Sequence, residues 1–173
     1  ARSSGKKFCR TMWQRIIEAF GNKENFAVVM ATCSQDPEAL AGLDIPGNFI
    51  VRRRCPQLDI LKVADAFITH GGANSTIESI SARVPMLCLP WFSDQPGNAR
   101  MISREGLGLH YESPLKDCSA AALERDVGRL LADRDAFVGN CARLSESLGE
   151  AGGAQRAAQC IEEYVASFNG HRL

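Results

Sequence analysis

The feature that most constrains this chain is the alternation of short apolar runs with longer amphipathic segments. The apolar runs predict five short strands, at residues 26–31, 49–51, 66–69, 86–89 and 107–111. Because the first run is apolar throughout and contains β-branched side chains, it predicts a strand buried on both faces. Apolar residues at helical spacing predict helices at residues 8–20, 75–83, 95–105, 120–132, 134–148 and 154–168.

Strands that alternate with helices are typical of a parallel sheet with helices on both faces. We therefore predict an α/β fold with a doubly wound, Rossmann-like parallel sheet. The 173 residues fit a single domain, residues 1–173, which can bury a core without disulfides or metals. Ligands bind such sheets at the carboxyl ends of the strands, so chemistry is expected after the third and fourth strands, at residues 69–75 and 90–95.

Charge and cysteine content exclude several classes of protein. The 20 Lys and Arg residues are balanced by 20 Asp and Glu residues, and the only basic run is Arg52–Arg54, which argues against binding to nucleic acid. Seven cysteines stand at irregular intervals without a C-x-x-C pair, which predicts buried, reduced thiols, no metal site and a cytoplasmic location. No run of about 18 apolar residues is present, so we predict neither a signal peptide nor a membrane span.

The sequence His70-Gly71-Gly72 lies between a predicted strand and a predicted helix. Glycines let the backbone approach a ligand closely, and the start of a helix favours phosphate. A tight turn is the alternative, with Ser75 as the N-cap and Glu78 completing a capping box. Asn74 and Glu78 share a helix face, where a carboxylate can accept hydrogen bonds from two ribose hydroxyls.

Asp94 and Gln95 follow the fourth predicted strand. An acidic side chain beside an amide is suited to binding sugar hydroxyls, but Asp94 is equally suited to cap the next helix. Arg54 follows the second strand, where its guanidinium could stack on an aromatic ring or form a solvated edge. His110 and His171 have no partner at metal or triad spacing, so we assign them structural or surface roles. Neither a Walker sequence nor G-x-G-x-x-G is present, which disfavours an NTPase or a dinucleotide-dependent oxidoreductase.

Taken together, the residues from Arg54 to Gln95 resemble the donor-binding signature of nucleotide-sugar glycosyltransferases of the GT-B fold. The pattern is nearest to the macrolide-type and plant UDP-glycosyltransferases, and the order of helices and strands is similar to the C-terminal half of that family. The matching residues are Pro56-Gln57, Leu61, Phe67–Gly72, Asn74–Thr76, Glu78-Ser79, Val84-Pro85, Pro90, Asp94-Gln95 and Asn98-Ala99.

The resemblance implies a role for each candidate residue. The diphosphate would be held by His70, Gly72, Asn74 and Ser75. The nucleobase and ribose would be held by Arg54, Gln57 and Glu78. The hydroxyls of the donor sugar would be held by Asp94 and Gln95. Arg54 stands where the plant signature has a Trp that stacks on uracil, and Ala73 stands where it has a second Trp.

The resemblance further implies that the intact protein is an inverting glycosyltransferase. Such an enzyme moves a sugar from a UDP-sugar to a hydroxyl of a small lipophilic acceptor, with no metal or other cofactor. The general base belongs to the family's N-terminal, acceptor-binding domain, so we expect no catalytic residue in this chain, which alone should bind donor without transferring sugar. The family also has a strand before the first helix, and that strand is central, so its absence would leave a gap in the sheet.

Two alternatives remain at this point. The chain could be a non-catalytic nucleotide-sugar-binding subunit that works with a separate acceptor-binding partner, an interpretation favoured by the opening helix. It could also be a nucleotide-sugar epimerase, since this activity occurs on the same fold. An epimerase needs acid and base groups beside the sugar, and Asp94 is the one candidate in the sequence.

Overall fold

The computed structural model describes residues 2–32 and 40–169. Their strands confirm the five predicted ones, within one or two residues at each end. They are β1 (Val28–Ala31), β2 (Phe49–Arg52), β3 (Phe67–Thr69), β4 (Met86–Cys88) and β5 (Gly108–His110). The chain therefore has the alternating α/β order that the apolar runs predict.

The helices include each predicted one and two short helices that were not predicted. The longer ones are α1 (Arg2–Phe20), α3 (Ala73–Ala82), α4 (Gln95–Arg104), α6 (Ala120–Ala132), α7 (Arg134–Glu150) and α8 (Gly153–Asn169). The short additions are α2 (Gln57–Leu61) and α5 (Pro114–Asp117). Helix α3 begins two residues earlier than predicted, which places its first turn directly after the glycine pair.

All strand pairs are parallel, but among the described residues the strands form two separate ladders. One ladder contains β1 and β2, and the other has the order β3-β4-β5. In a doubly wound sheet of strand order 3-2-1-4-5-6, removal of strand 1 leaves a two-stranded ladder, 3-2, and a three-stranded ladder, 4-5-6. The interruption between β1 and β3 is thus where the gap is expected.

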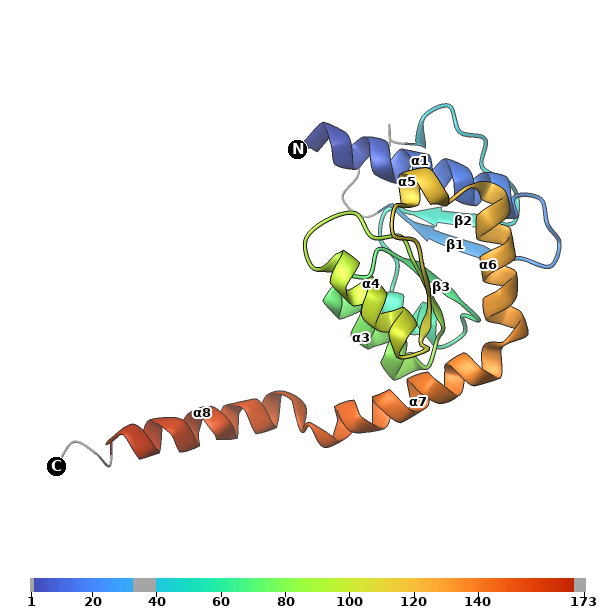
Figure 1. Ribbon diagram of the computed structural model, residues 1–173. Helices are drawn as coiled ribbons and strands as arrows, with labels where there is room; N and C mark the ends of the chain where they lie inside the picture. The colour runs from blue at the N-terminus through green and yellow to red at the C-terminus, as the bar shows by residue number, and fades with distance from the viewer. Residues whose placement is uncertain (1, 33–39, 170–173) are drawn as a thin grey trace.

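Helices cover the two faces of the sheet unequally (Figure 1). One core cluster joins both ladders to α1 and α6, through side chains such as Phe8, Met30, Leu87 and Leu123. The second cluster lies between the three-stranded ladder and helices α3, α4 and α7. Central strand β4 is fully enclosed, because Met86, Leu87 and Cys88 are each 0% exposed.

The expectation that the first strand is buried on both faces is wrong. Val28 and Met30 of β1 pack in the core, whereas Val29 is 42% exposed and its neighbour Ile50 on β2 is 53% exposed. The physical reason is that the second-face helices α3, α4 and α7 pack against the three-stranded ladder and not against β1 and β2.

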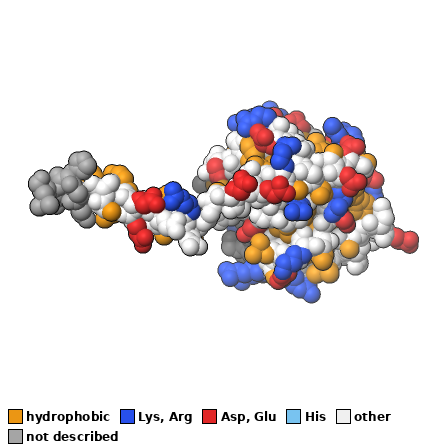
Figure 2. Space-filling model, turned by 90° about the horizontal axis from the view of Figure 1, so that it is seen from below, with side chains coloured by type: hydrophobic (Ala, Val, Ile, Leu, Met, Phe, Trp, Pro, Cys, Tyr) orange, Lys and Arg blue, Asp and Glu red, His pale blue; other side chains and the backbone are white. Residues whose placement is uncertain are grey.

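Helix α8 projects from the body of the molecule beyond α7 (Figure 1). Two glycines with positive φ, Gly152 at 74° and Gly153 at 53°, separate the two helices. The exposed hydrophobic side chains of α8 are Ile161, Tyr164, Val165 and Phe168. Figure 2 shows hydrophobic side chains on the projecting arm. No helix within the described residues is both long and apolar enough to span a membrane.

The prediction of buried cysteines is correct for some positions only. Cys88, Cys118 and Cys141 are buried free thiols, and burial raises the pKa of the Cys88 thiol to about 12. Cys160 on α8 is an exposed free thiol, because that helix has no packing partner in the described structure. Cys33 lies outside the described residues.

Two glycines provide a matched test of this packing. Gly108 of β5 pairs with Met86, and a Cβ at position 108 would lie 1.9 Å from the Met86 carbonyl oxygen. Because backbone cannot yield at this distance, we expect Gly108→Ala to destabilise the protein by about 3 kcal/mol. Gly128, inside α6, has no neighbour within 4 Å of a Cβ, so Gly128→Ala should stabilise it by about 0.5–1 kcal/mol. Urea unfolding measures the free energy of unfolding of both variants. Equal effects of the two substitutions would contradict the close packing of Gly108 against Met86.

Candidate functional site

A cleft of about 460 Å³ lies where β3 and β4 end. It joins the two loops that were singled out in the sequence, because both follow neighbouring parallel strands. From the first loop it is lined by His70, Gly72, Ala73, Asn74 and Ser75, and from the second by Phe92, Ser93, Asp94 and Gln95. The structure therefore brings the predicted phosphate-binding and sugar-binding residues together.

The glycine pair meets two different requirements. Gly71 has φ +78°, a left-handed conformation that favours glycine, and its N–H donates to Thr69 Oγ1 at 3.3 Å. Gly72 has an ordinary φ of −66°, but a Cβ there would lie 2.5 Å from His70 Nε2. The imidazole therefore lies directly over Gly72, and a larger residue would displace it.

Helix α3 begins at the cleft without a side-chain cap. Gly72 is the N-cap residue, so the alternative that Ser75 caps the helix in a capping box with Glu78 is wrong. The first intrahelical bond runs from the Thr76 N–H to the Gly72 carbonyl, which leaves the preceding N–H groups of the first turn without helical partners. The Ala73 N–H is engaged by the Asp94 carboxylate, and the remaining first-turn N–H groups together with the helix dipole make this helix end suited to an anion.

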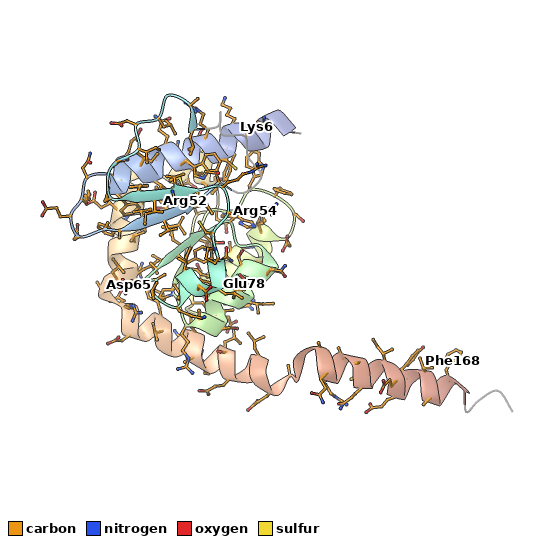
Figure 3. All side chains as sticks on the ribbon, turned by 180° about the vertical axis from the view of Figure 1, so that it is seen from behind. Lys6, Arg52, Arg54, Asp65, Glu78 and Phe168 are labelled. Atoms are coloured by element: carbon orange, nitrogen blue, oxygen red, sulfur yellow. The ribbon has the colours of Figure 1, made fainter. Side chains whose placement is uncertain are left out.

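Gln57, Ser75 and Glu78 form a hydrogen-bonded group beside the cleft. Gln57 Nε2 donates to Glu78 Oε2 at 2.6 Å and to Ser75 Oγ at 3.2 Å, which joins α2 to α3. Arg54 lies in the segment between β2 and α2, and its side chain is exposed. Arg54 does not line the cleft, but it and Glu78 can both be followed in Figure 3.

The 91–94 loop is held in place by Gln95 and by α1. Gln95 is 6% exposed, and its Oε1 accepts the backbone N–H groups of Trp91 at 2.9 Å and Phe92 at 3.2 Å. The Trp91 ring stacks on Phe8 of α1 with 4.6 Å between centroids. The acceptor end of the Gln95 amide is therefore engaged within the protein, and its Nε2 end is the part suited to a ligand.

Asp94 stands at the N-cap position of α4 but does not cap the helix through its side chain. Its Oδ2 instead accepts a hydrogen bond from Asn98 Nδ2 at 2.8 Å. The side-chain capping alternative for Asp94 is thus wrong. The carboxylate stays at the rim of the cleft, where it can accept hydrogen bonds.

The two ionisable groups of the cleft differ in charge. Burial lowers the pKa of His70 below its ordinary value of 6.5, and the nearby Asp94 charge opposes this only partly, so the imidazole is neutral at pH 7. Hydrogen bonds from its own backbone N–H and from Asn98 lower the pKa of Asp94, which is therefore ionised. A neutral imidazole, helix N–H groups and one carboxylate can bind a compound that is anionic at one end and hydroxylated at the other.

Asn98 is the residue whose contacts sequence reasoning missed, although it belongs to the quoted pattern. Its Nδ2 also donates to the Gly71 carbonyl at 2.8 Å. The signal available in the sequence was the i, i+4 spacing of Asp94 and Asn98 on one helix.

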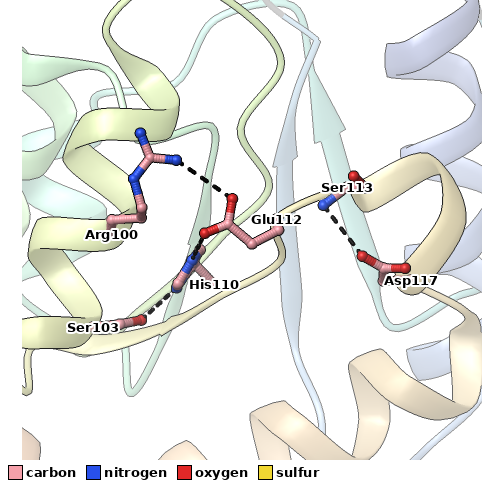
Figure 4. Close-up of polar contacts among 6 residues, drawn as sticks. All are labelled: Arg100, Ser103, His110, Glu112, Ser113 and Asp117. Carbon is pink, nitrogen blue, oxygen red and sulfur yellow. Dashed lines mark hydrogen bonds and ion pairs between the residues drawn. The ribbon is translucent and has the colours of Figure 1, made fainter.

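His110 belongs to a separate polar cluster (Figure 4). Its Nδ1 lies 2.7 Å from Ser103 Oγ and its Nε2 lies 3.1 Å from Glu112 Oε1, which joins α4 to the segment after β5. Arg100 pairs with the other oxygen of Glu112. This cluster does not line the cleft, and His171 lies outside the described residues. Among the residues that the structure describes, no three metal-ligating side chains are grouped together.

Residues 17–148 match the family model described as UDP-glucoronosyl and UDP-glucosyl transferase. The chain is 38% identical over 150 residues to the NDP-glycosyltransferase YjiC of Bacillus licheniformis. This alignment covers 87% of this chain and 37% of that protein. It is 32% identical over 162 residues to the oleandomycin glycosyltransferase of Streptomyces antibioticus, and this alignment covers 92% of this chain and 37% of the relative. The chain thus spans little more than a third of the length of these relatives.

A solved structure has the same arrangement of elements. The calicheamicin glycosyltransferase CalG4 superposes with a TM-score of 0.79 and is 28% identical, covering 91% of this chain and 38% of that one. The likeness extends over nearly all of the chain, so the doubly wound half-domain expected from the sequence is confirmed.

The electrostatics of the cleft can be tested without a ligand. Because the Asp94 charge raises the pKa of His70, we expect Asp94→Asn to lower that pKa further. Titration of the His70 ring by NMR measures the shift. Glu112→Gln removes a carboxylate outside the cleft and should leave the His70 pKa unchanged. A His70 pKa above 6.5 in the unaltered protein, or one that is the same in Asp94→Asn, would contradict the combined effect of burial and the Asp94 charge on His70.

Proposed function

Because the chain belongs to the UDP-glucoronosyl and UDP-glucosyl transferase family, we propose that it forms the donor site of a UDP-sugar glycosyltransferase. The observation that carries the proposal is the order of groups along the cleft. The Gln57–Glu78 pair reaches the first turn of α3 at Ser75, and the Asp94 loop lines the cleft together with that turn. A nucleoside, a diphosphate and a sugar follow one another in the same order in the donor.

The diphosphate is assigned to the centre of the cleft. His70 can donate one N–H to a phosphate oxygen because its imidazole is neutral and has one protonated nitrogen. Backbone N–H groups of Gly72 and of the first turn, with the Asn74 and Ser75 side chains, supply further donors. These groups are fixed in place, so they can stabilise negative charge as it grows on the leaving UDP.

The nucleoside is assigned to Arg54, Gln57 and Glu78. Glu78 can accept hydrogen bonds from the two ribose hydroxyls, since a carboxylate has two acceptor oxygens and Gln57 engages one of them. Gln57 then lies between the ribose and the base. The exposed Arg54 guanidinium can stack on the base in place of an aromatic ring.

The sugar is assigned to Asp94 and Gln95. Asp94 accepts hydrogen bonds from sugar hydroxyls, and Gln95 Nε2 donates to them, while its Oε1 holds the loop. Among the described residues Asp94 is the one carboxylate that lines the cleft, and the other ionisable group there, His70, is assigned to the diphosphate, so no second group is left beside the sugar for the acid and base pair of an epimerase. This favours transfer over epimerisation.

The reaction in this proposal is a direct displacement with inversion at the sugar carbon. The hydroxyl of a small lipophilic acceptor forms the new bond while the bond to UDP breaks, and the acceptor proton passes to a base in an acceptor-binding domain. Residues 1–173 act as one donor-binding domain, and neither a metal nor another cofactor is assigned a role. Free thiols such as Cys55 and Cys88 support a reducing, cytoplasmic compartment. The chain alone binds donor and does not transfer sugar.

A calorimetric titration with UDP tests the donor site. We expect binding in the micromolar range, about −8 kcal/mol, and weaker binding of UMP, which lacks the second phosphate. His70→Ala and Glu78→Ala should each weaken UDP binding about tenfold, the cost of one hydrogen bond to a charged group. Glu112→Ala is the control and should bind UDP normally. A folded protein that fails to bind UDP, or whose affinity ignores both cleft variants, would refute the proposal.

The pH dependence of donor binding tests the role of His70. An anion beside the imidazole raises its pKa from the lowered value of the free protein, so binding takes up a proton and affinity increases as pH falls from 7.5 to 5.5. UDP-glucose is the suitable probe because its diphosphate is a diester and does not titrate in this range, unlike the terminal phosphate of UDP. His70→Gln should make the affinity independent of pH. An equally steep profile in that variant would assign the proton to another group.

A further inference from the structure

Asn98 joins the two halves of the cleft through one nitrogen atom. Its Nδ2 donates to the Gly71 carbonyl at 2.8 Å and to Asp94 Oδ2 at 2.8 Å. Gly71 belongs to the loop after β3, and Asp94 belongs to the loop after β4. Since an amide nitrogen has two hydrogens, each hydrogen is used by one half of the cleft. Asn98 itself does not line the cleft.

The contact to Gly71 fixes part of the phosphate-binding loop. A peptide unit is planar and trans, so holding the Gly71 carbonyl also fixes the direction of the Gly72 N–H. The loop rests on α4 at the same place, because a Cβ on Gly71 would lie 3.5 Å from the Gln95 carbonyl oxygen and 3.9 Å from the Ala99 nitrogen. Asn98 thus holds an otherwise adaptable left-handed glycine against the helix.

The contact to Asp94 fixes a side chain that is otherwise exposed. Asn98 engages one carboxylate oxygen, Oδ2, and the backbone N–H groups of Asp94 and Ala73 and the Ser93 side chain also hydrogen-bond to this carboxylate. A neutral amide orients the carboxylate without neutralising it, which a Lys or Arg at this position would do. The Asn98 hydrogen bond also contributes to the lowered pKa of Asp94, which keeps the acceptor ionised.

We propose that Asn98 is a positioning residue that couples sugar recognition by Asp94 to diphosphate binding by the glycine loop. The inference rests on the proposed donor site and adds to it. Asn98 acts through its two neighbours and does not touch the donor. Its loss should therefore change the selectivity of the cleft, and not merely the stability of the protein.

The protein at its natural length is titrated with UDP and with UDP-glucose. Asn98→Ala should weaken UDP-glucose binding about tenfold more than UDP binding. The reason is that the lost hydrogen bond orients the charged Asp94, which we assign to the sugar, and UDP has no sugar beyond its diphosphate. Asn98→Asp keeps the side-chain shape, removes the N–H donor and places a like charge beside Asp94. It should therefore lower the ratio of UDP-glucose to UDP affinity further. If the protein transfers sugar, the same variants should lower kcat/KM for UDP-glucose.

Asn140→Ala is the matched control. Asn140 Nδ2 donates to the carbonyl of Gly106 at 3.0 Å, and Gly106 has φ +66°, so this residue also anchors a left-handed glycine, but outside the cleft. Its loss should lower thermal stability and leave the ratio of UDP-glucose to UDP affinity unchanged. The control separates a general packing defect from a defect in the cleft.

A double-mutant cycle with Asp94→Ala decides whether Asn98 acts through Asp94. In the Asp94→Ala background, Asn98→Ala should no longer change the UDP-glucose to UDP ratio. An unchanged ratio in Asn98→Ala itself, or an equal change with and without Asp94, would overturn the inference while the proposed donor site stands. A folded protein that binds neither UDP nor UDP-glucose would overturn the proposed function and this inference together.

Discussion

The left-handed turn at Gly71 is the constraint on which the cleft depends. It ends β3, places the His70 ring over Gly72, and starts α3 so that its first N–H groups have no partner within the helix. The same turn packs against the first turn of α4, where Gln95 and Asn98 hold the second loop. The helix end that we propose to bind the diphosphate and the carboxylate that we propose to bind the sugar are therefore parts of one packed unit.

Much of this arrangement could be predicted from the sequence because it depends on local signals. Five apolar runs became five strands, and the glycine pair marked a loop between a strand and a helix. The capping signals were misleading. Ser75 and Glu78 have the spacing of a capping box, yet tertiary contacts with Gln57 prevail and Gly72 takes the N-cap position. Parallel register then brought both predicted loops to one edge.

Other features could not be predicted because they depend on residues far apart in the chain. Helix α5 has four residues, too few to be stable alone, and Arg15 of α1 donates to the carbonyls of Pro114, Leu115 and Cys118 around it. The apolar run of β1 gave no sign that the second-face helices lie elsewhere. Likewise, the double contact of Asn98 requires the final position of Gly71.

The proposed function depends first on the binding of a UDP-sugar diphosphate at the start of α3. The most direct measurement is a two-dimensional NMR titration of the backbone amides with UDP. We expect the largest shifts at Gly72, Ala73, Asn74 and Ser75, with smaller shifts near Glu78 and Asp94. Saturable binding that leaves these amides unshifted, or that shifts the groove of Ile77, Ser145 and Leu148 between α3 and α7 instead, would contradict this expectation.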